Sequence, residues 1–162
     1  MRIKKIFGEI LLLSGVLMFP YPGFSGTPEP RSEEAKQIVS LVERAATLIE
    51  TRGKDAFPEF RITDGEWYKG ATYIFVIDMK GTSIVNPPSP ELEGTNVLDT
   101  KDANGKALIR EMIEMLESKE SGWIDYMWPR PGQTVPSKKS SYIKKVKPGE
   151  ETLIVGAGIY SD

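Results

Sequence analysis

Apolar residues recur every three or four positions between residues 32 and 53, which predicts an amphipathic helix of about 20 residues. Ser32 can cap its N-terminus, two acidic residues follow in the first turn, and Gly53 can end it. The apolar stripe consists of Ala35, Ile38, Val39, Val42, Ala45, Ala46, Leu48 and Ile49. A stripe of this width predicts that the helix covers a sheet.

Short apolar runs with a two-residue period predict five strands. Residues 73–87 indicate a hairpin, in which a run from Tyr73 to Ile77 enters Asp78-x-x-Gly81 and a second run stops at Pro87. In the third strand the same period puts Ile124, Tyr126 and Trp128 on one face. The last three strands are expected at residues 123–128, 139–146 and 152–160.

A second helix is expected between strands two and three. Asp102-Ala103-Asn104-Gly105 is interpreted as its start, with Asp102 or Asn104 as the cap, and its apolar face is Leu108, Ile109, Met112, Ile113 and Leu116. Residues 54–71 are predicted to be an aromatic loop with one short helical turn. This order predicts an α+β fold, PAS-like in outline: a five-stranded antiparallel sheet, a long N-terminal helix, and a second helix crossing between strands two and three.

The N-terminus suggests export. Three basic residues precede an apolar run of about ten residues, roughly half of what a membrane-spanning helix needs, and small residues follow at Gly23 and Ser25. We therefore expect a signal peptide at 1–25, a linker at 26–31 and one domain at 32–162, periplasmic or secreted, with no membrane span after cleavage. An uncleaved N-terminal anchor is the alternative. The formal net charge of −2 argues against a nucleic-acid partner.

The absence of histidine and cysteine excludes Ser-His and Cys-His catalysis, thiol chemistry, disulfides and most transition-metal sites. Ser141-x-x-Lys144 matches an acylating-enzyme pattern, but on a strand these two side chains point to opposite faces. The spacing from Asp102 to Glu111 partly matches a calcium loop, although its first position is Thr100, and helix capping is the preferred interpretation. No enzyme, metal or cofactor is therefore expected.

Aromatic and cationic residues are the candidates for a ligand site. The aromatic side chains are either core or the walls of a small-molecule pocket with a few polar groups; the candidates are Trp67, Tyr73, Tyr126, Trp128 and Tyr142. Arg61 is a possible cation for an anionic ligand. Gly156 and Gly158, at alternate positions of the last strand, leave room for a group that lies close to its backbone.

The ordered set of motifs resembles an extracytoplasmic Cache sensor domain of the single-domain kind, found in chemoreceptors and histidine kinases. The matching pieces are Tyr73-Ile74-Phe75-Val76, Asp78-x-x-Gly81, Asn86-Pro87, Gly94-Thr95-Asn96, Asp102-Ala103-Asn104-Gly105-Lys106, Gly122-Trp123-Ile124-x-Tyr126-x-Trp128, Lys139-Ser140-Ser141-Tyr142 and Gly156-Ala157-Gly158-Ile159-Tyr160. The chain departs from the family at Asn86, where many relatives have histidine.

The resemblance implies a pocket for a small organic acid or similar metabolite, with Lys139 near it. We expect a non-enzymatic sensor that binds an anionic ligand through Lys139, Tyr126, Tyr142 and aromatic walls, and that passes its signal to a membrane sensor or receptor protein. The alternative is a structural or protein-docking module of the same fold, whose pocket is filled by side chains. The sequence leaves the identity of the ligand open.

Overall fold

The computed structural model describes residues 32–161, so the expected signal peptide and linker lie outside the described residues. Helix α1 (Glu33–Arg52) is the predicted N-terminal helix. Ser32 caps it, since the Ser32 hydroxyl accepts a hydrogen bond from the Ala35 amide at 3.2 Å, and Gly53 ends it with a φ of 57°. Its buried face consists of Ala35, Ile38, Leu41, Val42, Ala45, Ala46 and Ile49. No helix within residues 32–161 combines the length and apolar character needed to cross a bilayer.

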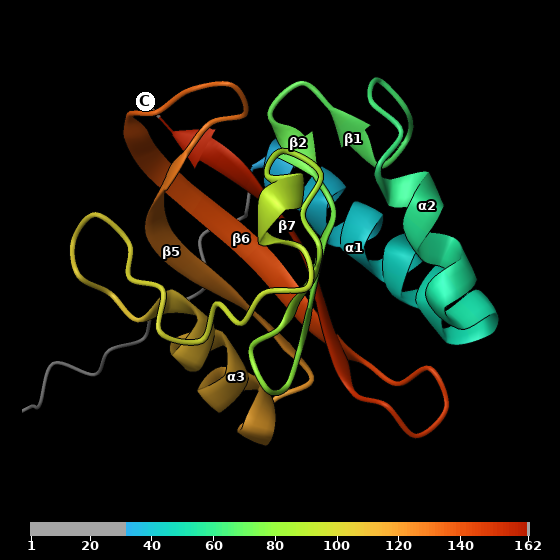
Figure 1. Cartoon of the computed structure of the whole chain (residues 1–162). Helices are drawn as coiled ribbons and strands as arrows, with labels where there is room; N and C mark the ends of the chain where they lie inside the picture. The colour runs from blue at the N-terminus through green and yellow to red at the C-terminus, as the bar shows by residue number, and fades with distance from the viewer. Residues whose placement is uncertain (1–31, 162) are drawn as a thin grey trace, which may run out of the picture. The chain divides into compact units, whose positions relative to one another are not determined.

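The predicted α+β fold is confirmed (Figure 1). The main sheet has five strands in the order β4-β3-β7-β6-β5, and every neighbouring pair is antiparallel. The strands are β3 (Phe75–Asp78), β4 (Ser83–Val85), β5 (Ser121–Pro129), β6 (Pro136–Val146) and β7 (Leu153–Ser161). The last strand in sequence is therefore the central strand of the sheet.

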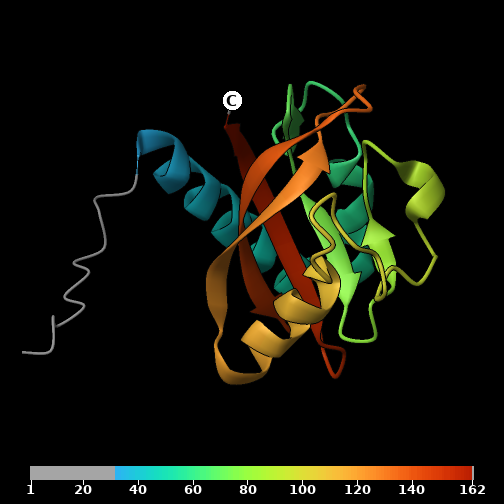
Figure 2. The same cartoon turned by 90° about the vertical axis from the view of Figure 1, so that its left-hand side faces the viewer.

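Two apolar clusters cover the two faces of this sheet. Alternate residues of β7 divide between them, since Val155 and Ala157 pack in the cluster with α1, while Ile154 packs in the cluster with helix α3 (Leu108–Ser118). The long segment between β4 and α3 lies across the sheet, on the side opposite to the N-terminal half of α1 (Figure 2). The face that carries α3 and the crossing segment is called the α3 face below.

The aromatic segment between α1 and β3 is more structured than predicted. It contains a 3₁₀ turn η1 (Gly53–Ala56), a short helix α2 (Phe57–Phe60) and a small hairpin of β1 (Tyr68–Lys69) and β2 (Thr72–Tyr73). Tyr73 therefore belongs to this hairpin and not to the first long strand, which begins at Phe75. A further 3₁₀ turn, η2 (Pro90–Leu92), lies in the crossing segment.

The prediction that Asp102 or Asn104 caps the second helix is wrong. The helix begins at Leu108, after Ala107, which makes no side-chain cap. Asp102 instead organises the preceding loop: its carboxylate accepts the amides of Asn104 at 2.8 Å, Lys106 at 2.9 Å and, on β5, Met127 at 2.9 Å. These bonds tie the crossing segment to β5, and no acidic cluster suited to a metal ion occurs among residues 32–161.

Candidate ligand-binding site

A cavity of about 50 Å³ lies on the α3 face of the sheet, between the strands, α3 and the crossing segment. This volume has room for about four water molecules, or for a molecule of a few heavy atoms. Its walls are mainly apolar, with polar groups from a few side chains. They are formed by Tyr73, Phe75, Ile77, Ser83, Val85, Asn86, Leu92, Val97, Thr100, Leu108, Ile109, Met112, Tyr126 and Trp128.

Lys139 is buried beside this cavity, with 1% of its surface exposed. In the sheet it lies between its register partners Tyr126 on β5 and Tyr160 on β7. Its Nζ donates a hydrogen bond of 2.8 Å to the hydroxyl of Tyr73, which is itself a cavity wall. The same Nζ lies 4.0 Å from the ring centroid of Tyr73 and 4.9 Å from that of Tyr160. Rings and one phenol thus surround the amine.

No carboxylate within residues 32–161 forms an ion pair with Lys139; its one hydrogen-bond partner there is neutral. Removal from water disfavours the charged form of an amine when no anion compensates. Burial therefore lowers the pKa of Lys139 from its usual 10.5 to about 7. Near neutral pH the side chain is divided between ammonium and free amine.

Three tyrosines and a serine form the polar surroundings of this amine. The hydroxyls of Tyr126 and Ser141 lie 2.9 Å apart, and the Tyr160 hydroxyl donates to the carbonyl of Pro129 at 2.8 Å. Burial is the main cause that raises the pKa of Tyr73, Tyr126 and Tyr160, so all three phenols remain neutral at physiological pH. They can donate or accept hydrogen bonds but carry no charge.

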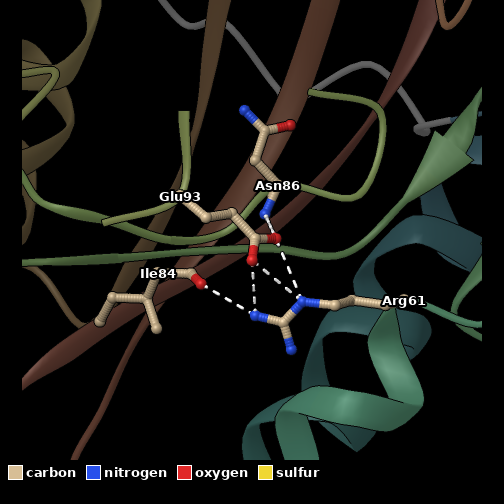
Figure 3. A network of polar contacts seen from close by, with 4 residues as sticks. All are labelled: Arg61, Ile84, Asn86 and Glu93. Carbon is tan, nitrogen blue, oxygen red and sulfur yellow. Dashed lines mark hydrogen bonds and ion pairs between the residues drawn. The ribbon is translucent and has the colours of Figure 1, made fainter. Parts of the chain in front are cut away.

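The ion pair between Arg61 and Glu93 holds the end of β4, beside the cavity (Figure 3). The Arg61 guanidinium donates to both oxygens of Glu93, with the shortest bond at 2.7 Å, and to the carbonyl of Ile84 at 3.1 Å. Glu93 in turn accepts the backbone amide of Asn86 at 2.7 Å. The pair therefore joins α2, the end of β4 and the crossing segment.

The sequence profile of the Cache domain matches residues 60–162, more than half of the chain. The chain belongs to the Cache domain family. Two curated relatives are similar to it: the methyl-accepting chemotaxis protein McpP of Pseudomonas putida, 32% identical over 59% of this chain, and the sensor histidine kinase MctS of Rhizobium johnstonii, 32% identical over 56%. The matched regions cover 17% and 19% of those relatives, so the chain corresponds to less than a fifth of their length.

Among solved structures, a Cache chemosensory domain that recognises carboxylic acids is similar to this one. It is 28% identical with a TM-score of 0.69, and the superposition covers 80% of this chain and 94% of that one. The identification of this chain as a Cache domain from its ordered motifs is thus confirmed.

The structure of this Cache domain separates the seven predicted ligand residues into two groups. Tyr73, Tyr126 and Trp128 line the cavity, and Lys139 donates to Tyr73 beside it. Lys139 does not itself line the cavity and adjoins it through Tyr73, whereas Trp67, Tyr142 and Arg61 neither line the cavity nor bond to these wall residues. The structure therefore gathers four of the seven residues at one cavity, and ligand binding by any of the seven remains a prediction.

Each of the three remaining residues has partners elsewhere. Trp67 packs edge-on against Phe60 within the apolar cluster of α1, and their ring centroids are 5.3 Å apart. Tyr142 lies on the α1 face, because it is three residues from Lys139 on the same strand, and its hydroxyl donates to Glu43 at 3.3 Å. The guanidinium of Arg61 is paired with the carboxylate of Glu93, which balances its charge.

Gly158 makes room for the buried lysine. A Cβ at this position would lie 2.8 Å from Cε of Lys139 and 2.3 Å from the Ser141 hydroxyl oxygen. At Gly156 a Cβ would lie 2.4 Å from the ring of Phe75. The groups that the two glycines were expected to admit are thus side chains of the site itself.

The substitution Gly158→Ala is expected to destabilise the domain by about 1–3 kcal/mol, because the added methyl group overpacks the β6–β7 interface. Thermal or urea unfolding measures this loss. Gly122→Ala is the matched control on β5, since its Cβ meets the Sδ of Met115, which is flexible and can move away. Equal losses of stability in the two variants would contradict the role assigned to Gly158.

Proposed function

We propose that this Cache domain is an exported, non-enzymatic sensor module that binds a small carboxylate in the cavity beside Lys139. The observation that carries the proposal is a buried amine with no anionic partner among residues 32–161, next to an open cavity. Burial of an uncompensated charge is costly, and a carboxylate ligand would compensate it.

The polar groups around the amine suit a carboxylate. The hydroxyl of Tyr73 accepts a hydrogen bond from Lys139 and shares a second one with the hydroxyl of Tyr160, so its hydrogen would turn from Tyr160 to donate to a ligand oxygen. A charge-assisted bond from Lys139 and a phenol donor would then hold the carboxylate, while the apolar walls would contact the carbon chain. Tyr126 and Trp128 are proposed as part of these walls.

The family supports a role in signalling. McpP is a chemotaxis protein and MctS a sensor kinase, and a similar solved domain recognises carboxylic acids. We propose a periplasmic or secreted location for the domain and a membrane sensor or receptor protein as its partner. The ligand would favour one arrangement of the segments that cross the sheet, through its higher affinity for that arrangement.

Short carboxylates are expected to stabilise the purified chain. A ligand at 100 times its Kd adds about 2.7 kcal/mol to the free energy of unfolding. In a chain of this size each kcal/mol raises the melting temperature by roughly 2–4 °C. Differential scanning fluorimetry with millimolar acetate, propionate and lactate measures the shift, and native mass spectrometry first establishes that the protein is free of ligand.

A protein that is shown to be free of ligand and that no short carboxylate stabilises would argue against the sensor. It would favour the alternative, a protein-docking module of the same fold. The cavity beside Lys139 favours the binding module, because the docking module was expected to have this space filled by side chains.

A further inference from the structure

Asn86 directly follows β4 and lines the cavity. Its side-chain oxygen Oδ1 is buried, and it is the one such polar atom within residues 32–161 that lacks a hydrogen-bond partner. Buried amide oxygens in folded proteins are nearly always paired, because loss of water without a replacement is unfavourable. An unpaired acceptor in the wall of a candidate ligand cavity is a position where a molecule bound in the cavity can supply the missing donor.

The neighbouring charged groups cannot supply this donor. Arg61 directs its guanidinium to Glu93 and to the carbonyl of Ile84, and Glu93 takes the backbone amide of Asn86. Figure 3 shows the side-chain amide of Asn86 extending away from this ion pair. The ion pair thus fixes the backbone at Asn86 and leaves the side chain free for the cavity.

The chemistry of the cavity limits which donor fits. None of the residues that line it is aspartate or glutamate, and the nearby amine of Lys139 is itself without an anion. A ligand ammonium group would be a second buried cation without a counter-ion, which is costly. A hydroxyl group is neutral and needs only one acceptor.

We infer that the ligand is a short hydroxycarboxylic acid, whose hydroxyl group donates a hydrogen bond to Oδ1 of Asn86 while its carboxylate binds Lys139 and Tyr73. This inference rests on the proposed function and adds to it the class of acid. The cavity volume of about 50 Å³ keeps the acid to a few heavy atoms.

Lactate and propionate test the inference, because they share a carbon skeleton and differ in one hydroxyl group. Isothermal titration calorimetry of the purified chain is expected to give one lactate enantiomer a Kd about tenfold lower than that of propionate. In Asn86→Leu, which has similar size but no acceptor, the ratio is expected to fall to about one. Asn86→Ala gives the same comparison where leucine prevents folding.

Leu92→Val is the matched control, since it alters the wall without removing a polar group. It is expected to shift the affinities for both acids by a similar factor and to preserve their ratio. Equal affinity for lactate and propionate in the unaltered chain would overturn the assignment to Asn86 while leaving the carboxylate sensor intact. Tighter binding of alanine than of lactate would overturn the choice of hydroxyl over ammonium. Binding of none of these acids would overturn both proposals.

Discussion

The substitution Lys139→Met is expected to weaken the binding of a short carboxylate by about 100-fold. Methionine fills a similar volume but removes the cation that contacts Tyr73 in the described part of the chain, so the ligand carboxylate would be buried without this positive partner. Isothermal titration calorimetry at pH 6.5, where Lys139 is mostly charged, measures the loss.

The same substitution is expected to raise the melting temperature of the ligand-free domain, because it removes a buried amine whose charge no anion compensates. Lys138→Met is the control: Lys138 is an exposed neighbour on the opposite face of β6, and its loss is expected to change neither property much. Unchanged affinity in Lys139→Met would contradict the proposed site. A lower melting temperature would contradict the uncompensated charge.

Carboxylate affinity is expected to be nearly constant between pH 5.5 and 7 and to fall by about tenfold per pH unit above pH 7. The cause is the pKa of Lys139, which burial lowers to about 7 in the ligand-free domain. Above this pH the amine is neutral, so a ligand anion binds only together with a proton. Tyr73, Tyr126 and Tyr160, which surround the amine, stay neutral over this range because burial raises the pKa of each.

Calorimetry between pH 6 and 9, in buffers of different ionisation enthalpy, measures both the affinity and the proton taken up. Lys139→Met is expected to abolish the pH dependence. For the ligand-free domain the sign is opposite: the unfolded chain holds more protons than the folded one between pH 7 and about 10, so its stability rises with pH there. Affinity that is constant to pH 9 would contradict the lowered pKa.

Periodicity alone predicted both helices and all five strands of the main sheet, because each has one face against a continuous apolar cluster. The same periodicity also predicted that alternate side chains of β7 point to opposite faces of the sheet. The start of the second helix was misjudged because Asp102 uses its carboxylate for its own loop and for β5, 25 residues away. Local spacing cannot reveal such a distant partner.

The candidate site was predicted less completely than the fold. The two-residue period already puts Lys139 and Tyr142 on opposite faces of one strand, so their separation was available from the sequence. The ion pair of Arg61 could not be predicted from the sequence, since its partner Glu93 lies 32 residues away in an irregular segment. The unpaired oxygen of Asn86 becomes apparent only when every neighbouring bond is known.

The pairing of β6 with β7 restricts how the lengths of related chains can differ. Lys139 lies opposite Tyr160, and a slip of one residue would turn the amine toward α1 and bring Ser140 to the cavity side. Insertions and deletions within these two strands are therefore far more disruptive than replacements. The turn between them, at residues 147–152, is where homologues can gain or lose residues and still keep the amine in place.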